Sequence, residues 1–200
     1  MNRIESLNQS MFLWFNASAN TPVWAIAVVA GVADLLIYVV PLLLLVMWLW
    51  GNEEKRRLAI KCAIVAMLGV GINQLIGMAW QHPRPFMMGL GHTFASHAPD
   101  SSFPSDHATV LFGAGLTLLL SRATVSGLVI LIIGLCVAWA RLFLGVHFPL
   151  DVVGAAVVAC AALAVVNPLW KRFADRVTKP AEIVYRKMLA KPIALGWVRR

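Results

Sequence analysis

Charge is scarce in this sequence. Only 13% of its 200 residues are Asp, Glu, Lys or Arg, whereas 60% are hydrophobic. Soluble globular domains are about one-quarter charged, so the composition excludes an ordinary water-soluble domain. The apolar residues also form runs of about 20 residues, the length that spans the hydrocarbon core of a bilayer. The composition therefore predicts an integral membrane protein.

Cysteine is also rare, and its placement argues against a disulfide framework. The three cysteines, Cys62, Cys136 and Cys160, lie inside apolar runs, and we interpret them as small core residues rather than metal ligands. A clear cleavable signal peptide is lacking as well, because residues 1–20 are too polar and carry a single basic residue. We expect the first membrane segment to direct insertion instead.

Five apolar segments predict an all-α fold, a polytopic membrane helix bundle with about five transmembrane helices. They cover residues 22–50, 58–80, 107–121, 125–143 and 151–169. The segment 107–121 is short for a full crossing, so its polar start at Ser105 is expected within or close to the membrane boundary. Residues 6–17 are mixed in polarity and form either a surface helix or an ordinary leader into the first span.

Basic residues divide unevenly between the two sides of this bundle. The side that receives residues 55–61, Arg122 and the segment after residue 170 holds 14 of the 17 Lys and Arg residues. Because cytoplasmic loops retain Lys and Arg, this side is predicted to be the cytoplasm, with the amino terminus outside. Residues 1–170 then form a membrane-embedded domain and residues 171–200 a basic cytoplasmic tail, which we expect to meet anionic lipid headgroups rather than nucleic acid.

The opposite side is poor in basic residues and holds the residues suited to chemistry. All five histidines and three aspartates lie in or beside its loops: His82, His92, His97, His107, His147, Asp100, Asp106 and Asp151. Most of them belong to three short sequences, which are HPRPF at 82–86, PSDH at 104–107 and RLFLGVHFPLD at 141–151. A candidate site is therefore predicted on the side away from the cytoplasm.

The cationic groups in these sequences suit a phosphate. Arg84 stands between two prolines that fix the local backbone, and Arg141 ends an apolar span, where an unpaired charge is unfavourable. Two arginine forks converging from different helices can each make paired hydrogen bonds to phosphate oxygens. Ser105 stands where a helix begins, and the free N–H groups of a helix start bind anions. We therefore expect Arg84, Ser105 and Arg141 to bind phosphate.

A nucleophile and an acid are available beside them. His147 and Asp151 are four residues apart at the start of a span, so the carboxylate can hold one ring nitrogen and leave the other free to attack. His107 can then give a proton to a leaving oxygen. Taken singly, each residue also has an ordinary explanation: an interfacial histidine, arginines that anchor topology, or a helix cap at Asp106. These explanations do not account for the gathering of ionisable residues on one side.

In order and spacing, the three sequences resemble the phosphatidic acid phosphatase type 2 superfamily of lipid phosphate phosphatases. That family's pattern is Lys, six residues and Arg-Pro; then Pro-Ser-Gly-His; then Ser-Arg, five residues, His, three residues and Asp. The resemblance covers residues 77–151 and rests on Arg84, Pro85, Pro104, Ser105, His107, Arg141, His147 and Asp151. The chain departs from the pattern at three positions, which are Gly77 for lysine, Asp106 for glycine and Ala140 for serine.

Two of these departures affect the phosphate site. Gly77 removes one cation, and we hypothesise that His82 fills part of the gap. Asp106 adds a negative charge next to the expected phosphate, so it should turn outward or share a proton or cation with its neighbours. His82 and Asp106 are therefore accessory candidates.

HPRPF together with PSDH in a short chain resembles the bacitracin-resistance-type undecaprenyl-diphosphate phosphatases of bacterial membranes. The resemblance implies hydrolysis of undecaprenyl diphosphate to the monophosphate, which is recycled for peptidoglycan synthesis. It also implies a place in the bacterial cytoplasmic (inner) membrane, with the site on the periplasmic face. We expect His147 as nucleophile, Asp151 as its orienting partner and His107 as acid, with no metal or other cofactor and no obligate protein partner.

Other functions stay open at the level of sequence. The motifs recognise phosphate and not the lipid tail, so a phosphatase for phosphatidylglycerophosphate or phosphatidate, or a lipid phosphotransferase, fits the same residues. A small anion transporter would show inverted repeats and broken helices, and neither is evident. A metal site built from His107, His147 and Asp151 would be unfavourable beside two arginines.

One acid lies inside the first span. Asp34 is about 18 Å from the outer end of that span at 1.5 Å per residue. An acid at such depth is unfavourable unless it has a partner. We expect Asp34 to bond Asn73 of the second span as a structural contact rather than to take part in catalysis.

Overall fold

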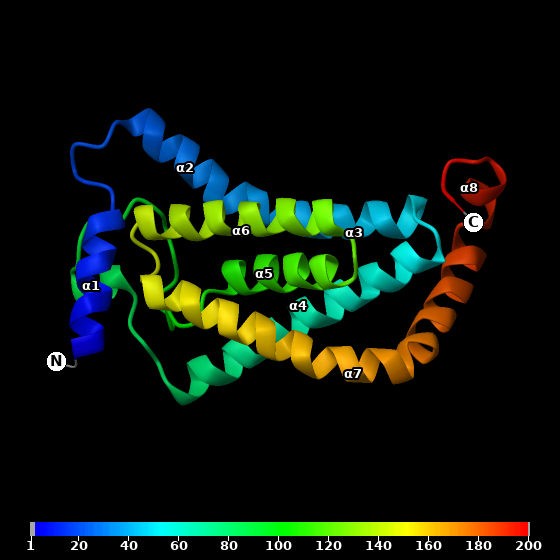
Figure 1. Ribbon diagram of the computed structural model, residues 1–200. Helices are drawn as coiled ribbons and strands as arrows, with labels where there is room; N and C mark the ends of the chain where they lie inside the picture. The colour runs from blue at the N-terminus through cyan, green and yellow to red at the C-terminus, as the bar shows by residue number, and fades with distance from the viewer. Residues whose placement is uncertain (1–2, 200) are drawn as a thin grey trace.

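The computed structural model describes residues 3–199, which form a bundle of helices (Figure 1). In chain order the elements are α1 (Arg3–Phe15), α2 (Val23–Leu35), the 3₁₀ turn η1 (Leu36–Tyr38), α3 (Val39–Trp50), α4 (Glu53–Ala79), the 3₁₀ turn η2 (Pro85–Met88), α5 (Asp106–Leu120), α6 (Thr124–Phe143), α7 (Pro149–Met188) and α8 (Ala190–Ala194). No β-strand occurs between residues 3 and 199. The predicted all-α fold is confirmed.

All five predicted membrane segments are helical. Four stretches are long and apolar enough to cross a membrane: Val23–Trp50, Glu53–Ala79, Thr124–Phe143 and Pro149–Met188. The predicted short segment is α5, which has 15 residues. Its polar start lies well inside the outline of the bundle, because α5 begins deeper than the neighbouring ends of α6 and α7 (Figure 1).

The first and last spans differ from the prediction. The first is interrupted by η1, so α2 leans away from the bundle while α3 runs along it (Figure 1). The last continues through Pro168 and Pro180 to Met188, and its second half bends back so that the Arg199 N–H donates to the Leu49 carbonyl (2.9 Å). The expected boundary at residue 170 falls inside α7, and the division into a membrane domain and a cytoplasmic tail stays a prediction.

Helix α5 is the centre of the bundle, packed against α4, α6 and α7 (Figure 1). Small residues permit this close packing. A Cβ on Gly134 of α6 would lie 3.0 Å from the Phe112 ring of α5, and a Cβ on Gly127 would lie 2.6 Å from the Leu119 backbone nitrogen. Glycines at such contacts let helix backbones approach closely, as membrane helices commonly do.

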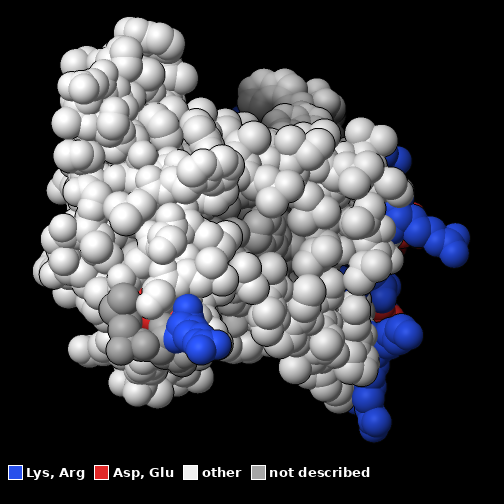
Figure 2. Space-filling model, turned by 60° about the vertical axis from the view of Figure 1, so that its left-hand side comes forward, with Lys and Arg blue, Asp and Glu red and all other residues white. Residues whose placement is uncertain are grey.

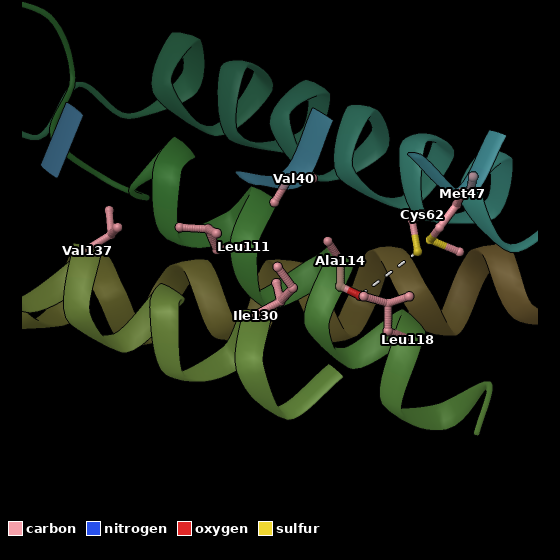
Figure 3. Close-up of a cluster of buried hydrophobic side chains, with 9 residues drawn as sticks. Val40, Met47, Cys62, Leu111, Ala114, Leu118, Ile130 and Val137 are labelled. Atoms are coloured by element: carbon pink, nitrogen blue, oxygen red, sulfur yellow. Dashed lines mark hydrogen bonds between the residues drawn. The ribbon is translucent and has the colours of Figure 1, made fainter. Parts of the chain in front are cut away.

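The buried core along α5 is apolar. Its largest cluster joins α3, α4, α5 and α6 and includes Val40, Met47, Cys62, Leu111, Ala114, Leu118, Ile130 and Val137 (Figure 3). Cys62 is fully buried there, with its Sγ 4.0 Å from the Ala114 carbonyl oxygen. All three cysteines are free, but Cys136 and Cys160 are exposed. The expectation of a core position is wrong for these two, because a helix that faces lipid is as apolar outside as inside.

The outer surface of the helices is also apolar. Large side chains of α2 and α6 are more than half exposed, including Trp24, Val28, Leu35, Ile132 and Leu135. On the face drawn in Figure 2, Lys and Arg are visible near the lower left and along the right-hand edge, and the broad surface between them is almost free of charge. Such a surface is stable in contact with lipid tails and would be unfavourable in water.

Helix α1 crosses the end of the bundle where α6 and α7 meet (Figure 1). Its Phe12 is fully buried and packs edge-to-face on Phe148, with ring centroids 5.3 Å apart. The buried Asn8 accepts a hydrogen bond from the Leu150 N–H (3.0 Å) through Oδ1. Of the two alternatives for residues 6–17, this position agrees with a surface helix rather than with an in-line leader to α2.

Candidate active site

The three predicted sequences meet at the recessed start of α5, around a cavity of about 510 Å³. Arg84 comes from the segment between α4 and η2, His107 from the first turn of α5, and His147 from the turn between α6 and α7. All three line the cavity, together with the accessory candidates His82 and Asp106. Among the residues that the structure describes, the three remaining candidates are not part of this lining: Ser105, Arg141 and Asp151.

His147 is held by Asp151 as the spacing predicts. The ring Nδ1 lies 3.2 Å from Oδ2 of Asp151, whose side chain is 1% exposed. The same Oδ2 accepts the Phe148 N–H (2.7 Å) and the Ser102 hydroxyl. A carboxylate accepts hydrogen bonds, so the His147 proton sits on Nδ1 and the lone pair is on Nε2. That lone pair faces Arg84, whose Nη1 is 3.4 Å away.

The protonation state of His147 follows from its burial. Its side chain is 4% exposed, and desolvation lowers the pKa of His147 below its ordinary value of about 6.5. The hydrogen bond and charge of Asp151 oppose part of this shift, whereas Arg84 adds to it. The imidazole is therefore neutral at neutral pH, which is the state that a nucleophile needs.

Ser102 was not identified from the sequence. It is fully buried and donates to Asp151, with its Oγ also 3.4 Å from Nδ1 of His147. It precedes the PSDH sequence by two residues, and nothing in its local pattern distinguishes it from Ser101. Its role arises because the segment before α5 lies against the start of α7, where the Ser105 N–H donates to the Asp151 carbonyl (3.2 Å).

Arg84 is fixed by hydrogen bonds that three of its side-chain nitrogen atoms donate. Nε donates to Oδ1 of Asp100 (2.8 Å), Nη1 to the Val146 carbonyl (3.2 Å) and Nη2 to the Ser101 carbonyl (3.2 Å). The side chain of Arg84 is 6% exposed, whereas that of Asp100 is 60% exposed. The guanidinium is thus anchored in the lining of the cavity and already has a carboxylate partner, which the sequence did not predict.

Arg141 faces His107 rather than the cavity. Its Nη2 lies 2.6 Å from Nε2 of His107, 3.3 Å from Oδ1 of Asp34 and 3.3 Å from the Ala33 carbonyl. Its Nε is buried without a hydrogen-bond partner. Arginine has no acceptor, so Nε2 of His107 must accept, and His107 is neutral in this arrangement.

The expectation for Asp34 was wrong. Asp34 pairs with Arg141, whereas Asn73 donates to Oδ1 of Asp106 (2.7 Å) and to Thr109 (3.0 Å). The error has a geometric cause: α5 is short, so the site is sunk into the bundle to the level of Asp34. The acid in the first span is therefore part of the site's surroundings.

Asp106 is turned toward α4 by two amides. Besides Asn73, Gln74 donates to its Oδ2 (3.1 Å). These neutral donors take the place of the proton or cation that the sequence suggested. Ser105 is the first residue before α5, as expected, but its buried Oγ makes no capping bond and has no partner. Buried polar atoms without partners are uncommon, and the residues on either side of Ser105 in the chain, Pro104 and Asp106, line the cavity.

The position of the family lysine is Gly77, and the cavity has no cation there. A Cβ on Gly77 would lie 3.4 Å from Cβ of Ser101. His82 lines the same cavity, but its Nε2 lies 3.4 Å from Glu5 of α1 and its Nδ1 is buried without a partner. An accessory role for His82 stays a prediction.

A metal centre is not formed by these residues. Between residues 3 and 199 there is no group of three or more His, Cys, Asp or Glu side chains placed to hold a metal ion. His107 in particular bonds to Arg141 and not to the His147–Asp151 pair. The alternative of a His107–His147–Asp151 metal site is therefore not supported by this geometry.

Residues 58–175 match the model of the PAP2 superfamily. This chain belongs to the PAP2 superfamily. Within the superfamily it is 37% identical to YbjG of Escherichia coli, over 98% of this chain and 99% of that protein. It is 34% identical to the undecaprenyl-diphosphatase BcrC of Bacillus subtilis, over 76% of this chain and 79% of that protein.

A solved structure has the same fold. LpxE of Aquifex aeolicus superimposes with a TM-score of 0.67, covering 81% of this chain and 95% of LpxE, at 20% sequence identity. The agreement supports the PAP2 arrangement of helices around the site. At this identity it concerns the fold alone.

Proposed function

We propose that this PAP2 protein hydrolyses undecaprenyl diphosphate to undecaprenyl phosphate and inorganic phosphate through a phosphohistidine on His147. The observation that carries the proposal is the orientation of His147. Its Nδ1 is held by the buried Asp151, so that the Nε2 lone pair faces Arg84 in the cavity. The lipid is inferred from the relative named undecaprenyl-diphosphatase, which matches most of the chain.

The first step forms a bond from Nε2 of His147 to the terminal phosphorus and breaks the bond from that phosphorus to the bridging oxygen. Asp151 stabilises the positive charge that develops on the imidazole. Arg84, Arg141, the Ser105 hydroxyl and the first N–H groups of α5 offset the charge on the phosphoryl oxygens. Undecaprenyl phosphate leaves with the bridging oxygen.

His107 protonates that oxygen. In the geometry described above it cannot do so, because its Nε2 accepts from Arg141. When a phosphoryl group takes over the Arg141 N–H, Nε2 of His107 is free to take up a proton from solvent, and the imidazolium is then the acid. Binding of the anionic substrate therefore prepares the acid as well as the phosphate contacts.

In the second step, water attacks the phosphohistidine. His107, now neutral, removes a proton from the water, and the bond between phosphorus and Nε2 of His147 breaks. Inorganic phosphate is released and His147 returns to its starting state. No metal enters the proposed steps, because the arginines and the α5 start supply the positive charge that a metal supplies in other phosphoryl transfers.

The proposal is tested by phosphate release from undecaprenyl diphosphate, with purified protein in detergent and excess EDTA. Wild type should release phosphate, and His147→Ala should lose several orders of magnitude in rate. His92→Gln is the matched control, since His92 is on the same side but does not line the cavity. Turnover that depends on metal and survives His147→Ala would reject the mechanism. Faster release from phosphatidylglycerophosphate or phosphatidate would reject the lipid assignment.

We also propose that the site faces the extracytoplasmic side of the bacterial inner membrane and that the basic residues after 170 contact anionic lipid. The proposal is supported by the distribution of Lys and Arg, of which 14 of 17 belong to the opposite side. Labelling of a cysteine placed at His92 or Lys191 with an impermeant reagent, in intact spheroplasts, tests it. Labelling at 191 but not at 92 would reverse the orientation.

A further inference from the structure

Arg141 is bound outside the cavity. Its Nη2 contacts Asp34, the Ala33 carbonyl and His107, and Arg141 does not line the cavity although His107 does. Because Arg141 does not line the cavity, its guanidinium must move to reach a phosphoryl group there, and this movement draws Nη2 away from these partners. The partner that carries an opposing charge is Asp34.

The two members of the pair differ strongly in exposure. The Arg141 side chain is 6% exposed and the Asp34 side chain is 59% exposed. Arg84 and Asp100 show the same asymmetry, at 6% and 60%. In each pair the arginine is fixed inside the protein and the carboxylate lies at its edge, so the carboxylate is the member that an anion can replace.

We propose that Asp34 is a positioning residue that holds Arg141 beside His107 and competes with the phosphoryl group for Arg141. The inference rests on the proposed function only in taking a phosphoryl group as the ligand. It assigns a role to the first span, which lies outside the 58–175 region matched by the family model and outside the three motif sequences.

The competition weakens binding of phosphate and favours its release. Each time a phosphoryl group takes the Arg141 N–H groups, Asp34 loses its cationic partner, and a carboxylate without a partner is unfavourable in a membrane protein. That penalty is removed when product phosphate leaves and the pair re-forms. When the pair re-forms, Arg141 again donates to Nε2 of His107, so His107 gives the proton that it took from water to the solvent and returns to its neutral state.

The test compares anion binding by wild type, Asp34→Asn and Asp34→Glu in detergent, by calorimetric titration with orthovanadate and with inorganic phosphate. Asp34→Asn should bind both anions about fivefold tighter, the scale of one partly exposed ion pair. Its KM for the lipid should fall while kcat does not rise, and Asp34→Glu should stay close to wild type. Asp34→Ser is a second neutral variant if Asp34→Asn does not fold.

Two controls separate this role from a structural one. The first control is Asp175→Asn, which removes the carboxylate that contacts another arginine, Arg57, at 2.7 Å. Neither residue lines the cavity, so this variant should leave anion binding unchanged. In an Arg141→Ala background, Asp34→Asn should have no effect on vanadate affinity, because the group for which it competes is gone.

Unchanged or weaker anion binding by the neutral Asp34 variants would overturn the proposal. It would also be overturned if Asp34→Asn increased vanadate affinity equally in the Arg141→Ala background. Binding of vanadate needs no lipid substrate. If the wild-type protein binds vanadate but does not hydrolyse undecaprenyl diphosphate, the proposed function is rejected. The role of Asp34 is then still decided by the vanadate titration of its variants. A wild type that binds neither anion overturns both.

Discussion

Oδ2 of Asp151 accepts three hydrogen bonds at once, from Nδ1 of His147 (3.2 Å), from the Phe148 N–H (2.7 Å) and from the Ser102 hydroxyl. Two of the donors are backbone or ring groups whose positions are set by the start of α7. The orientation of the His147 ring is therefore determined by the same turn that begins the helix. Any change at Asp151 acts directly on His147, the proposed nucleophile.

Asp151→Asn should lower kcat by roughly 10³- to 10⁴-fold, as replacement of the orienting carboxylate does in hydrolytic triads. An amide cannot accept from all three donors through one oxygen while stabilising an imidazolium. Ser102→Ala is the matched control: it removes one donor, leaves the carboxylate in place and should cost about tenfold or less. Both variants are compared by phosphate release, with thermal unfolding to show that they fold. Equal losses in the two would contradict the orienting role of Asp151.

The activity should persist to lower pH than an ordinary histidine nucleophile permits. Burial lowers the pKa of His147 below about 6.5, so the neutral, reactive form remains as the pH falls through 6.5 and is lost only below the lowered pKa. The acid limb of kcat/KM should therefore lie below pH 6.5. The same shift predicts that folding stability declines as the pH falls below 6.5, because the unfolded chain then binds a proton that the folded site resists.

His97 provides the control for that measurement. Burial and Arg84 lower the pKa of His97 as well, and His97 lines the same cavity. His97→Gln should leave the acid limb of kcat/KM in place if His147 is the group that titrates. A limb that disappears in His97→Gln would assign the titration to His97 instead.

The local geometry of the site could be predicted from the sequence because it depends on short separations. The four-residue spacing of His147 and Asp151 at a helix start leaves few arrangements, and the structure has the expected one. The place of Ser105 before α5 was predictable for the same reason. These relationships are properties of one turn of backbone and do not depend on how the helices pack.

Contacts between distant segments could not be predicted. Asp34 and Arg141 are 107 residues apart, and their meeting depends on the depth at which α5 begins, which composition does not set. Cys136 was misplaced because lipid-facing and core-facing positions of a membrane helix carry the same apolar residues. The partner of Arg84, Asp100, lies in a loop whose path no periodic pattern describes.

Arg84 and Asp100 should differ in importance although they form one ion pair. Arg84→Lys should lower kcat/KM by about 100-fold, because an ammonium cannot reproduce a fork that faces both phosphate and the Val146 and Ser101 carbonyls. Asp100→Asn should change it by about fivefold or less, since Asp100 is 60% exposed and the two carbonyls still hold the guanidinium. Steady-state kinetics on the lipid distinguishes the two. A larger effect at Asp100 would mean that the carboxylate itself meets the substrate.

Restoring the family lysine at Gly77 should strengthen phosphate binding. A Cβ at this position makes an ordinary 3.4 Å contact with Cβ of Ser101, and Gly77 lines the cavity, so Gly77→Lys fits and can extend its ammonium toward the phosphate. One charge-assisted hydrogen bond predicts a KM lower by about tenfold. Helix stability should also rise by about 0.5–1 kcal/mol, because glycine is unfavourable inside α4.

Gly77→Gln separates the charge from the change in helix propensity. It has a long side chain and no charge, so it should share the gain in thermal stability and leave KM nearly unchanged. The salt dependence of KM should steepen in Gly77→Lys and stay as in wild type in Gly77→Gln. An equal KM in the two variants would show that the lysine does not reach the phosphate. The competing partner for its charge is then Asp106, which lines the same cavity and bonds to Asn73 and Gln74 of the same helix.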